Sequence, residues 1–192
     1  YIERPRKEYK LPKTLSKEEV LAMIESCKFI KHRLIIELLY SAGLRRSELL
    51  NLKITDVDLD QNLIYIRNSK GKKDRITLLA ENIKPDLIKY LQEEVPSYWI
   101  IESPSRTQYS GTSVGNIVKA AAKNAQIIKT VTPHMLRHSF ATHLLEQGVD
   151  IRYIQELLGH TSTETTMIYT HVSKSDFAKI KSPFDNIKKC KH

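Results

Sequence analysis

Residues 132–148 read TPHMLRHSFATHLLEQG and predict a helix that joins the core of the fold to a polar site. Pro133 lies in the first turn, where proline is favoured, and Gly148 is a typical residue at the end of a helix. The apolar side chains recur at helical spacing: Leu136, Phe140, Leu144 and Leu145. We therefore expect this face of the helix to pack against the core.

The polar side of the same helix carries residues suited to an anion. His134 and Arg137 are three positions apart, so they share a face and can converge on one oxygen-rich ligand. His134 also lies in the first turn, where the helix dipole favours negative charge. The alternative is a metal held by His134 and His138, but Met135 stands where a His-Glu-x-x-His zinc enzyme has its glutamate. We therefore predict no metal, and structural, hydrogen-bonded roles for His138 and His143.

Helices are also predicted on both sides of this stretch. Ser16 and Glu19 form a capping box that begins one helix, and Gly43 is placed to end the next. Apolar spacing and capping residues predict helices at about 16–27, 34–43, 46–50, 81–95, 112–126 and 151–158.

Two β-rich runs predict a hairpin, 63–67 (LIYIR) and 75–79 (RITLL), and 99–101 (WII) predicts a short apolar strand or an extended piece. The fold class is therefore mainly α with a small antiparallel β-sheet, an α+β fold. The hairpin tip is basic, and its Lys70 is a mobile point charge suited to proton donation or to phosphate contact. The alternative is a solvated lysine-rich turn.

Residues 43–48 (GLRRSE) predict a fixed corner between two helices. Arg45 projects from this corner, and an arginine on rigid backbone can hold a phosphate bidentately at any relevant pH. Glu48 follows three residues later, within reach to orient the corner. A surface arginine at an ordinary helix junction is the alternative.

Tyr169 lies in the stretch 159–171 (GHTSTETTMIYTH), just after a capping box of Thr161 and Glu164. A free phenol has a pKa of about 10 and is mostly protonated at neutral pH. Attack by Tyr169 on phosphate therefore needs positive charge on the phosphate oxygens and proton transfer nearby. His160 follows a helix end in this stretch, and His171 is expected to be a surface imidazole.

The composition limits the class of partner. The 192 residues contain 31 Lys+Arg against 22 Asp+Glu, a formal net charge of +9, which favours nucleic acid first and an anionic membrane surface second. No apolar run approaches the roughly 20 residues of a spanning helix. Cys27 and Cys190 are few and far apart, which predicts a reducing, cytoplasmic compartment without a structural disulfide.

Five motifs, in order, resemble the catalytic domain of tyrosine recombinases, the lambda-integrase-like family, and among them the Xer type. The resemblance covers the chain from about residue 14 to residue 173. The motifs are Gly-Leu-Arg-x-Ser-Glu at 43–48, Lys-Gly-x-Lys-(Asp/Glu)-Arg at 70–75, His-x-Leu-Arg-His-x-Phe-Ala-Thr-His at 134–143, Leu-Leu-Gly-His at 157–160 and Thr-Thr-x-x-Tyr-Thr-His at 165–171.

The resemblance implies site-specific DNA recombination through a covalent 3′-phosphotyrosine intermediate, with no cofactor and no metal. The implied catalytic residues are Arg45 and Arg137 on the scissile phosphate, Lys70 as proton donor to the leaving 5′ oxygen, His134 as acid/base, His160 as hydrogen-bond donor and Tyr169 as nucleophile. Glu48 matches the acidic residue behind the first arginine. Lys72, Lys73 and Arg75 are expected to contact DNA.

The same resemblance predicts the domain organisation. Residues 1–13 are expected to be a linker or arm, 14–173 the catalytic domain and 174–192 a C-terminal tail helix. Family members carry an N-terminal core-binding domain of about a hundred residues, which implies a fragment of a longer recombinase or a short variant. The expected partners are double-stranded DNA and further copies in a tetrameric synapse. Whether the tail docks on its own domain or on a neighbour stays open.

Three alternatives stay open from the sequence. A type IB topoisomerase uses the same catalytic set to relax one duplex. A non-catalytic DNA-binding protein of the same fold would be expected to lack Arg45, Arg137 or Tyr169, and all three are present. A metal-dependent hydrolase would use His134 and His138.

Overall fold

The computed structural model describes residues 14–67, 74–159 and 179–187. Its α-helices are α1 (Lys17–Glu25), α2 (Ile30–Ser41), α3 (Arg46–Asn51), α4 (Lys84–Glu94), α5 (Gly111–Asn124), α6 (Pro133–Glu146) and α7 (Ile151–Leu158). The strands are β1 (Val57–Asp58), β2 (Leu63–Ile66) and β3 (Arg75–Leu78), and the 3₁₀ helices are η1 (Ile54–Asp56), η2 (Glu81–Ile83) and η3 (Pro183–Asn186). The predicted fold class, mainly α with a small antiparallel sheet, is confirmed.

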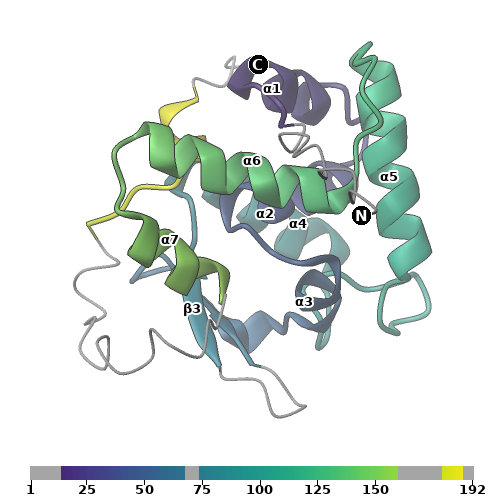
Figure 1. Ribbon diagram of the computed structural model, residues 1–192. Coiled ribbons are helices and arrows are strands. Elements are labelled where there is room, and N and C mark those ends of the chain that lie inside the picture. The colour runs from purple at the N-terminus through teal and green to yellow at the C-terminus, as the bar shows by residue number, and fades with distance from the viewer. Residues whose placement is uncertain (1–13, 68–73, 160–178, 188–192) are drawn as a thin grey trace, which may run out of the picture.

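Helix α2 is the centre of the core. Every residue from Leu34 to Ser41 is buried, and α2 contacts α1, α3, α4, α5 and α6. Helix α6 crosses α2 with Leu136, Phe140 and Leu144 fully buried, as its apolar spacing predicts. In Figure 1, α6 lies across the front of α2, with α7 and β3 to one side and α5 to the other.

The sheet is small, and its strands run antiparallel in the order β1-β2-β3. In the predicted hairpin Leu63 pairs with Leu78 and Ile66 with Arg75. The strand expected at 99–101 is reduced to one bridge between Lys53 and Trp99. The physical reason is that Lys53 lies in the short stretch between the end of α3 and the start of η1. That stretch is too short to form a longer strand that could pair with residues 99–101.

The described part of the tail packs on its own domain. The tail helix was expected over 174–192, but the helical piece within 179–187 is the 3₁₀ helix η3, which starts at Pro183. Phe184 is fully buried and meets Tyr40 edge to face, with ring centroids 6.1 Å apart. The side-chain amide of Asn82 donates to the carbonyls of Phe184 (3.0 Å) and Ile187 (3.1 Å). Aromatic burial and backbone hydrogen bonds together hold this segment.

Among the residues that the structure describes, no helix has both the length and the apolar character needed to span a membrane.

Candidate active site

Glu48 marks the centre of the site. It lies in the first turn of α3 and is only 6% exposed. The backbone N–H of Arg45 donates to its Oε2 at 2.8 Å, and the Arg45 guanidinium donates to its Oε1 at 3.0 Å. A carboxylate is favoured there because the free N–H groups and the dipole of the helix N-terminus are positive. Arg45 and Glu48 therefore close the corner that the sequence predicts.

Two further arginines reach Glu48 from distant segments. Arg75 begins β3 and donates from Nη2 to Oε2 at 2.6 Å and from Nε to Oε1 at 3.3 Å. Arg137 lies in α6, and its Nη1 is 3.6 Å from Oε2 of Glu48. Three arginines from three separate segments therefore gather around one carboxylate.

Arg137 is held by backbone as well as by charge. It is 3% exposed, and its Nη1 donates to the carbonyl of Gly43 at 2.6 Å. Its Nη2 donates to the carbonyl of Leu158, in the last turn of α7. The corner before α3, helix α6 and the end of α7 thus meet at one guanidinium.

The cluster of Arg45, Glu48, Arg75 and Arg137 has a formal charge of +2, from three guanidinium groups and one carboxylate. Burial lowers the pKa of Arg137 to about 10, and the charges of Arg75 and Arg45 act in the same direction against the opposing effect of Glu48. Burial alone raises the pKa of Glu48, but Arg75, hydrogen bonds from Arg75 and Arg45, and the charge of Arg137 outweigh it and lower the pKa. At neutral pH the cluster is therefore charged and suited to one more anion.

The half-exposed Arg45 is the member of the cluster that solvent reaches most readily. Its side chain is 38% exposed, against 4% for that of Arg137. Any anion that approaches from solvent would therefore meet Arg45 first, with the buried charge of Arg137 behind it.

His134 stands at the exposed N-terminal end of α6, one turn before Arg137. Its ring meets that of His138 edge to face, with centroids 4.3 Å apart. Burial lowers the pKa of His138, and the nearby charges of His134 and Arg137 lower it further. His138 is therefore a neutral support for the exposed ring of His134 at neutral pH.

His143 has the structural, hydrogen-bonded role predicted for it. It is buried, and its Nδ1 shares a hydrogen bond of 2.8 Å with the hydroxyl of Tyr40. Within the described ranges no three His, Cys, Asp or Glu side chains come together in a way that could hold a metal ion.

Five predicted site residues lie outside the described residues: Lys70, Lys72, Lys73, His160 and Tyr169. The structure does describe the segments next to them in the sequence. The pairing of Ile66 with Arg75 defines the base of the hairpin, and α7 ends at Leu158, whose carbonyl accepts from Arg137. The roles of these five residues stay predictions.

Arg75, which is expected to contact DNA together with Lys72 and Lys73, is buried in the structure. It is 9% exposed, and its Nη1 donates to the carbonyl of Leu157 while the rest of the guanidinium binds Glu48. The pattern of residues around Arg75 did not predict this central position. The one sequence feature that could have indicated it is a charged residue at the first position of a predicted strand.

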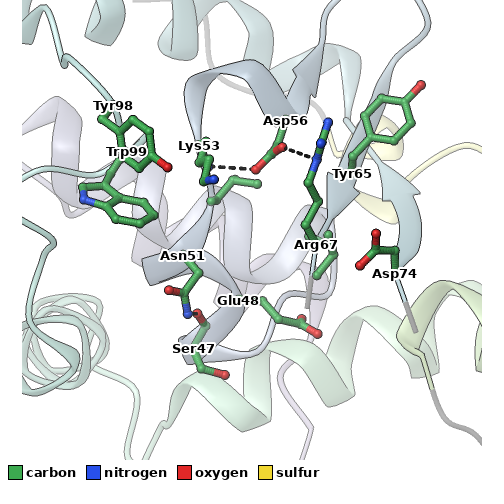
Figure 2. Close-up of a pocket in the computed structure, with 12 residues that line it drawn as sticks. Ser47, Glu48, Asn51, Lys53, Asp56, Tyr65, Arg67, Asp74, Tyr98 and Trp99 are labelled. Atoms are coloured by element: carbon green, nitrogen blue, oxygen red, sulfur yellow. Dashed lines mark hydrogen bonds and ion pairs between the residues drawn. The ribbon is translucent and has the colours of Figure 1, made fainter. Parts of the chain in front are cut away.

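A cavity of about 470 Å³ adjoins the cluster on the side of Glu48. Figure 2 shows Glu48 at one end of this cavity and Lys53, Asp56 and Arg67 farther along it. Asp56 Oδ1 forms an ion pair with Arg67 Nε at 2.9 Å, and Asp56 Oδ2 accepts a hydrogen bond from the backbone N–H of Lys53 at 3.1 Å. The ammonium of Lys53 stands 5.1 Å from the ring centroid of Tyr98. The charged side chains of Lys53, Asp56 and Arg67 in this cavity thus each have a contact nearby, whereas the cluster has a net positive charge.

Comparisons with known proteins agree with the motifs. The chain is 44% identical over 185 residues to "Tyrosine recombinase XerA" of Thermococcus kodakarensis, covering 93% of this chain and 64% of the relative. The structure resembles "Crystal structure of XerA recombinase" with a TM-score of 0.76 and 39% identity, over 87% of this chain and 63% of the other.

A further solved structure is titled "Crystal structure of XerH site-specific recombinase bound to difH substrate: pre-cleavage complex". It matches with a TM-score of 0.71 and 31% identity, over 85% of this chain and 51% of the other. The chain thus spans less than two thirds of the length of each of these three proteins. Residues 13–176 match the Phage integrase family. The chain belongs to this family, and the resemblance seen in its five motifs is confirmed.

Proposed function

We propose that this chain is the catalytic part of a tyrosine-type site-specific recombinase, which cleaves and rejoins double-stranded DNA. The observation that carries the proposal is the cluster of the half-exposed Arg45 and the buried Arg75 and Arg137 around Glu48, with its formal charge of +2. A phosphodiester carries one negative charge, so it is an anion that this cluster can accept. The similarity to XerA over most of the chain supports the same reaction.

Charge stabilisation is the main contribution of the cluster. The pentacovalent transition state spreads negative charge over the phosphate oxygens, and fixed cations placed around it lower the barrier. Arg45 and Arg137 would bind these oxygens. Both are oriented before substrate arrives, Arg45 by Glu48 and Arg137 by the carbonyls of Gly43 and Leu158. Little reorganisation is then needed during the reaction.

Tyr169 would supply the nucleophile. Its Oη attacks the phosphorus, the bond from phosphorus to the 5′ oxygen breaks, and Lys70 gives the leaving oxygen its proton. His134 would take the phenolic proton, and His160 would donate a hydrogen bond to a phosphoryl oxygen. One phosphodiester replaces another, so a 5′ hydroxyl of a partner strand can reverse the step without ATP or metal.

The remaining predicted contacts fit the same scheme. Lys72 and Lys73 would bind the DNA backbone beside the hairpin, which adds affinity without sequence preference. A tetrameric synapse would bring four copies together through the tail 174–192, whose residues 179–187 pack on their own domain in the single chain. A DNA substrate and the free, buried Cys27 suit a cytoplasmic protein.

A nicked suicide substrate carrying a random site library tests the function. We expect a covalent protein–DNA product in excess chelator, with a sequence preference among the trapped sites. Strict dependence on Mg²⁺ would contradict the metal-free scheme. Relaxation of supercoils without recombinant product would instead indicate the topoisomerase alternative.

A further inference from the structure

Arg75 occupies a place in the active-site cluster that direct DNA contact does not explain. Its side chain is 6% exposed. All three nitrogens of its guanidinium donate to protein acceptors, Nε and Nη2 to Glu48 and Nη1 to the carbonyl of Leu157. A guanidinium engaged in this way has a role inside the protein.

We propose that Arg75 is a positioning residue for strand cleavage, which fixes Glu48 and the end of α7 in one arrangement and thereby orients Arg45 and Arg137. The inference rests on the proposed recombinase function and assigns a role to a residue that does not itself touch the phosphate.

Both oxygens of the Glu48 carboxylate accept from or face arginine side chains. Its Oε1 accepts from Arg45 Nη1 at 3.0 Å and from Arg75 Nε at 3.3 Å. Its Oε2 accepts from Arg75 Nη2 at 2.6 Å and lies 3.6 Å from Arg137 Nη1. Each oxygen therefore faces the side chain of Arg75 and that of one of the two phosphate-binding arginines, and Oε2 also accepts from the backbone N–H of Arg45 at 2.8 Å. Arg75 binds both oxygens through the planar fork of its guanidinium, which fixes the plane of the carboxylate. Arg45 also reaches both oxygens, but it does so with its backbone N–H and one side-chain nitrogen.

The second contact of Arg75 reaches the end of α7. The last carbonyls of a helix have no partner within the helix, and a cation near them is favoured. Arg75 binds the carbonyl of Leu157, and Arg137 binds the next one, that of Leu158. His160 follows two residues after Leu158 in the sequence. Arg75 thus links the carboxylate to the helix that leads towards a predicted catalytic histidine.

Gly159 shows how closely Arg75 fits. Its φ of +65° is a left-handed conformation that favours glycine. A Cβ built on it would lie 2.6 Å from Cδ of Arg75, closer than carbon atoms approach. The end of α7 therefore leaves space for the Arg75 side chain by having no side chain of its own at residue 159.

The test compares three variants in the full chain. Arg75→Met removes the charge and keeps a long side chain. Arg75→Lys keeps the charge but loses the fork, so it cannot bind both Glu48 oxygens and Leu157 together. Thr77→Val is the matched control, because Thr77 lies on the same strand and is fully buried. The substitution removes one hydrogen bond, from the Thr77 hydroxyl to the carbonyl of Ala42 at 2.7 Å.

Single-turnover cleavage of a nicked substrate at saturating DNA is measured beside the DNA dissociation constant and the unfolding midpoint. We expect the cleavage rate constant to fall about a hundredfold in Arg75→Met, as for other small misplacements of catalytic groups, with DNA affinity within about twofold of wild type. Arg75→Lys is also expected to be slow. Thr77→Val is expected to lose stability and keep its rate.

A pH profile separates positioning from general destabilisation. The charge of Arg75 is the strongest of the effects that lower the pKa of Glu48. Its loss therefore moves the acid limb of the cleavage profile to higher pH in Arg75→Met and leaves that of Thr77→Val in place. Equal slowing of Arg75→Met and Thr77→Val at matched stability overturns the proposal.

The remaining outcomes are also decisive. If Arg75→Met does not fold, Arg75→Lys decides, and a wild-type rate with a wild-type pH profile in Arg75→Lys overturns the positioning role. That result leaves the recombinase function in place when the wild-type chain forms covalent product. Absence of covalent product from the wild-type chain overturns both.

Discussion

The guanidinium of Arg137 donates to the carbonyl of Gly43, with Nη1 and the oxygen 2.6 Å apart. This bond ties the middle of α6 to the corner that carries Arg45. The corner can come this close because Gly43 has a φ of +59° and no side chain. A built Cβ at Gly43 would lie 2.4 Å from Cδ1 of Phe140. The contact between α2 and α6 and the orientation of both arginines therefore depend on the same glycine.

Gly43→Ala is expected to lower the free energy of unfolding by about 2 kcal/mol or more, from left-handed strain together with overpacking against Phe140. Urea denaturation measures the change. Gly115→Ala in α5 is the control, because a Cβ there meets no atom within 4 Å, and alanine in a helix interior is expected to be neutral or stabilising. Equal stability of the two variants would contradict the packing argument.

Arg137→Ala is expected to slow strand cleavage by at least about a hundredfold, the usual effect of losing one donor to the developing charge. It also leaves the carbonyls of Gly43 and Leu158 without this donor. Single-turnover trapping on a nicked substrate measures the rate. Lys89→Ala, at an exposed position of α4, is the control and is expected to cleave normally. Wild-type cleavage by Arg137→Ala would remove this arginine from the mechanism.

Tyr169→Phe is expected to abolish the covalent product and to leave DNA affinity nearly unchanged, because only the nucleophilic oxygen is lost. Denaturing gels read the covalent product, and a binding titration reads the affinity. Tyr98→Phe removes a hydroxyl from an exposed tyrosine and serves as the control. Covalent trapping by the Tyr169→Phe chain would show that another residue is the nucleophile.

The lowered pKa of Glu48 predicts a specific pH dependence of stability. In the folded state its pKa lies below the ordinary value of 4.5. Its contribution is therefore complete above about pH 4.5 and is lost as the pH falls through the folded-state pKa. We expect Glu48→Gln to lose about 3 kcal/mol or more at pH 7, since three arginines remain without their carboxylate, and less at pH 3.

Urea denaturation of wild type and Glu48→Gln at several pH values measures this difference. Glu93→Gln is the control, because Glu93 is exposed and its nearest ion pair is 3.8 Å long. A difference between wild type and Glu48→Gln that stays constant from pH 7 to pH 3 would show that the carboxylate charge is not the stabilising feature.

Local rules predict most of the fold but leave part of the site uncertain. The capping residues and apolar spacing of α1 and α6 place these helices correctly, because their signals are local. The corner at Arg45 and Glu48 also follows from local signals, since the two residues are three positions apart on the same turn.

Arg75 shows where local reasoning ends. In the run RITLL, alternation puts Ile76 on one face and Arg75 with Thr77 on the other. A half-exposed strand would turn the polar pair to solvent, but Arg75 and Thr77 are the buried residues and Ile76 is half-buried. The reason is that α7 and Glu48 cover this face, and their approach depends on packing between distant segments.

The tail offers a last test, because its described part behaves as core. Phe184 is fully buried against Tyr40, and Asn82 holds the backbone on both sides of Asp185. We expect Phe184→Ala to lower the free energy of unfolding by about 3–5 kcal/mol, the usual loss for a buried phenylalanine. Ile128→Ala is the control, since Ile128 is fully exposed and its truncation is expected to change stability by less than about 0.5 kcal/mol. Measured without DNA, equal stabilities of these two variants would show that residues 179–187 do not pack on their own domain in solution.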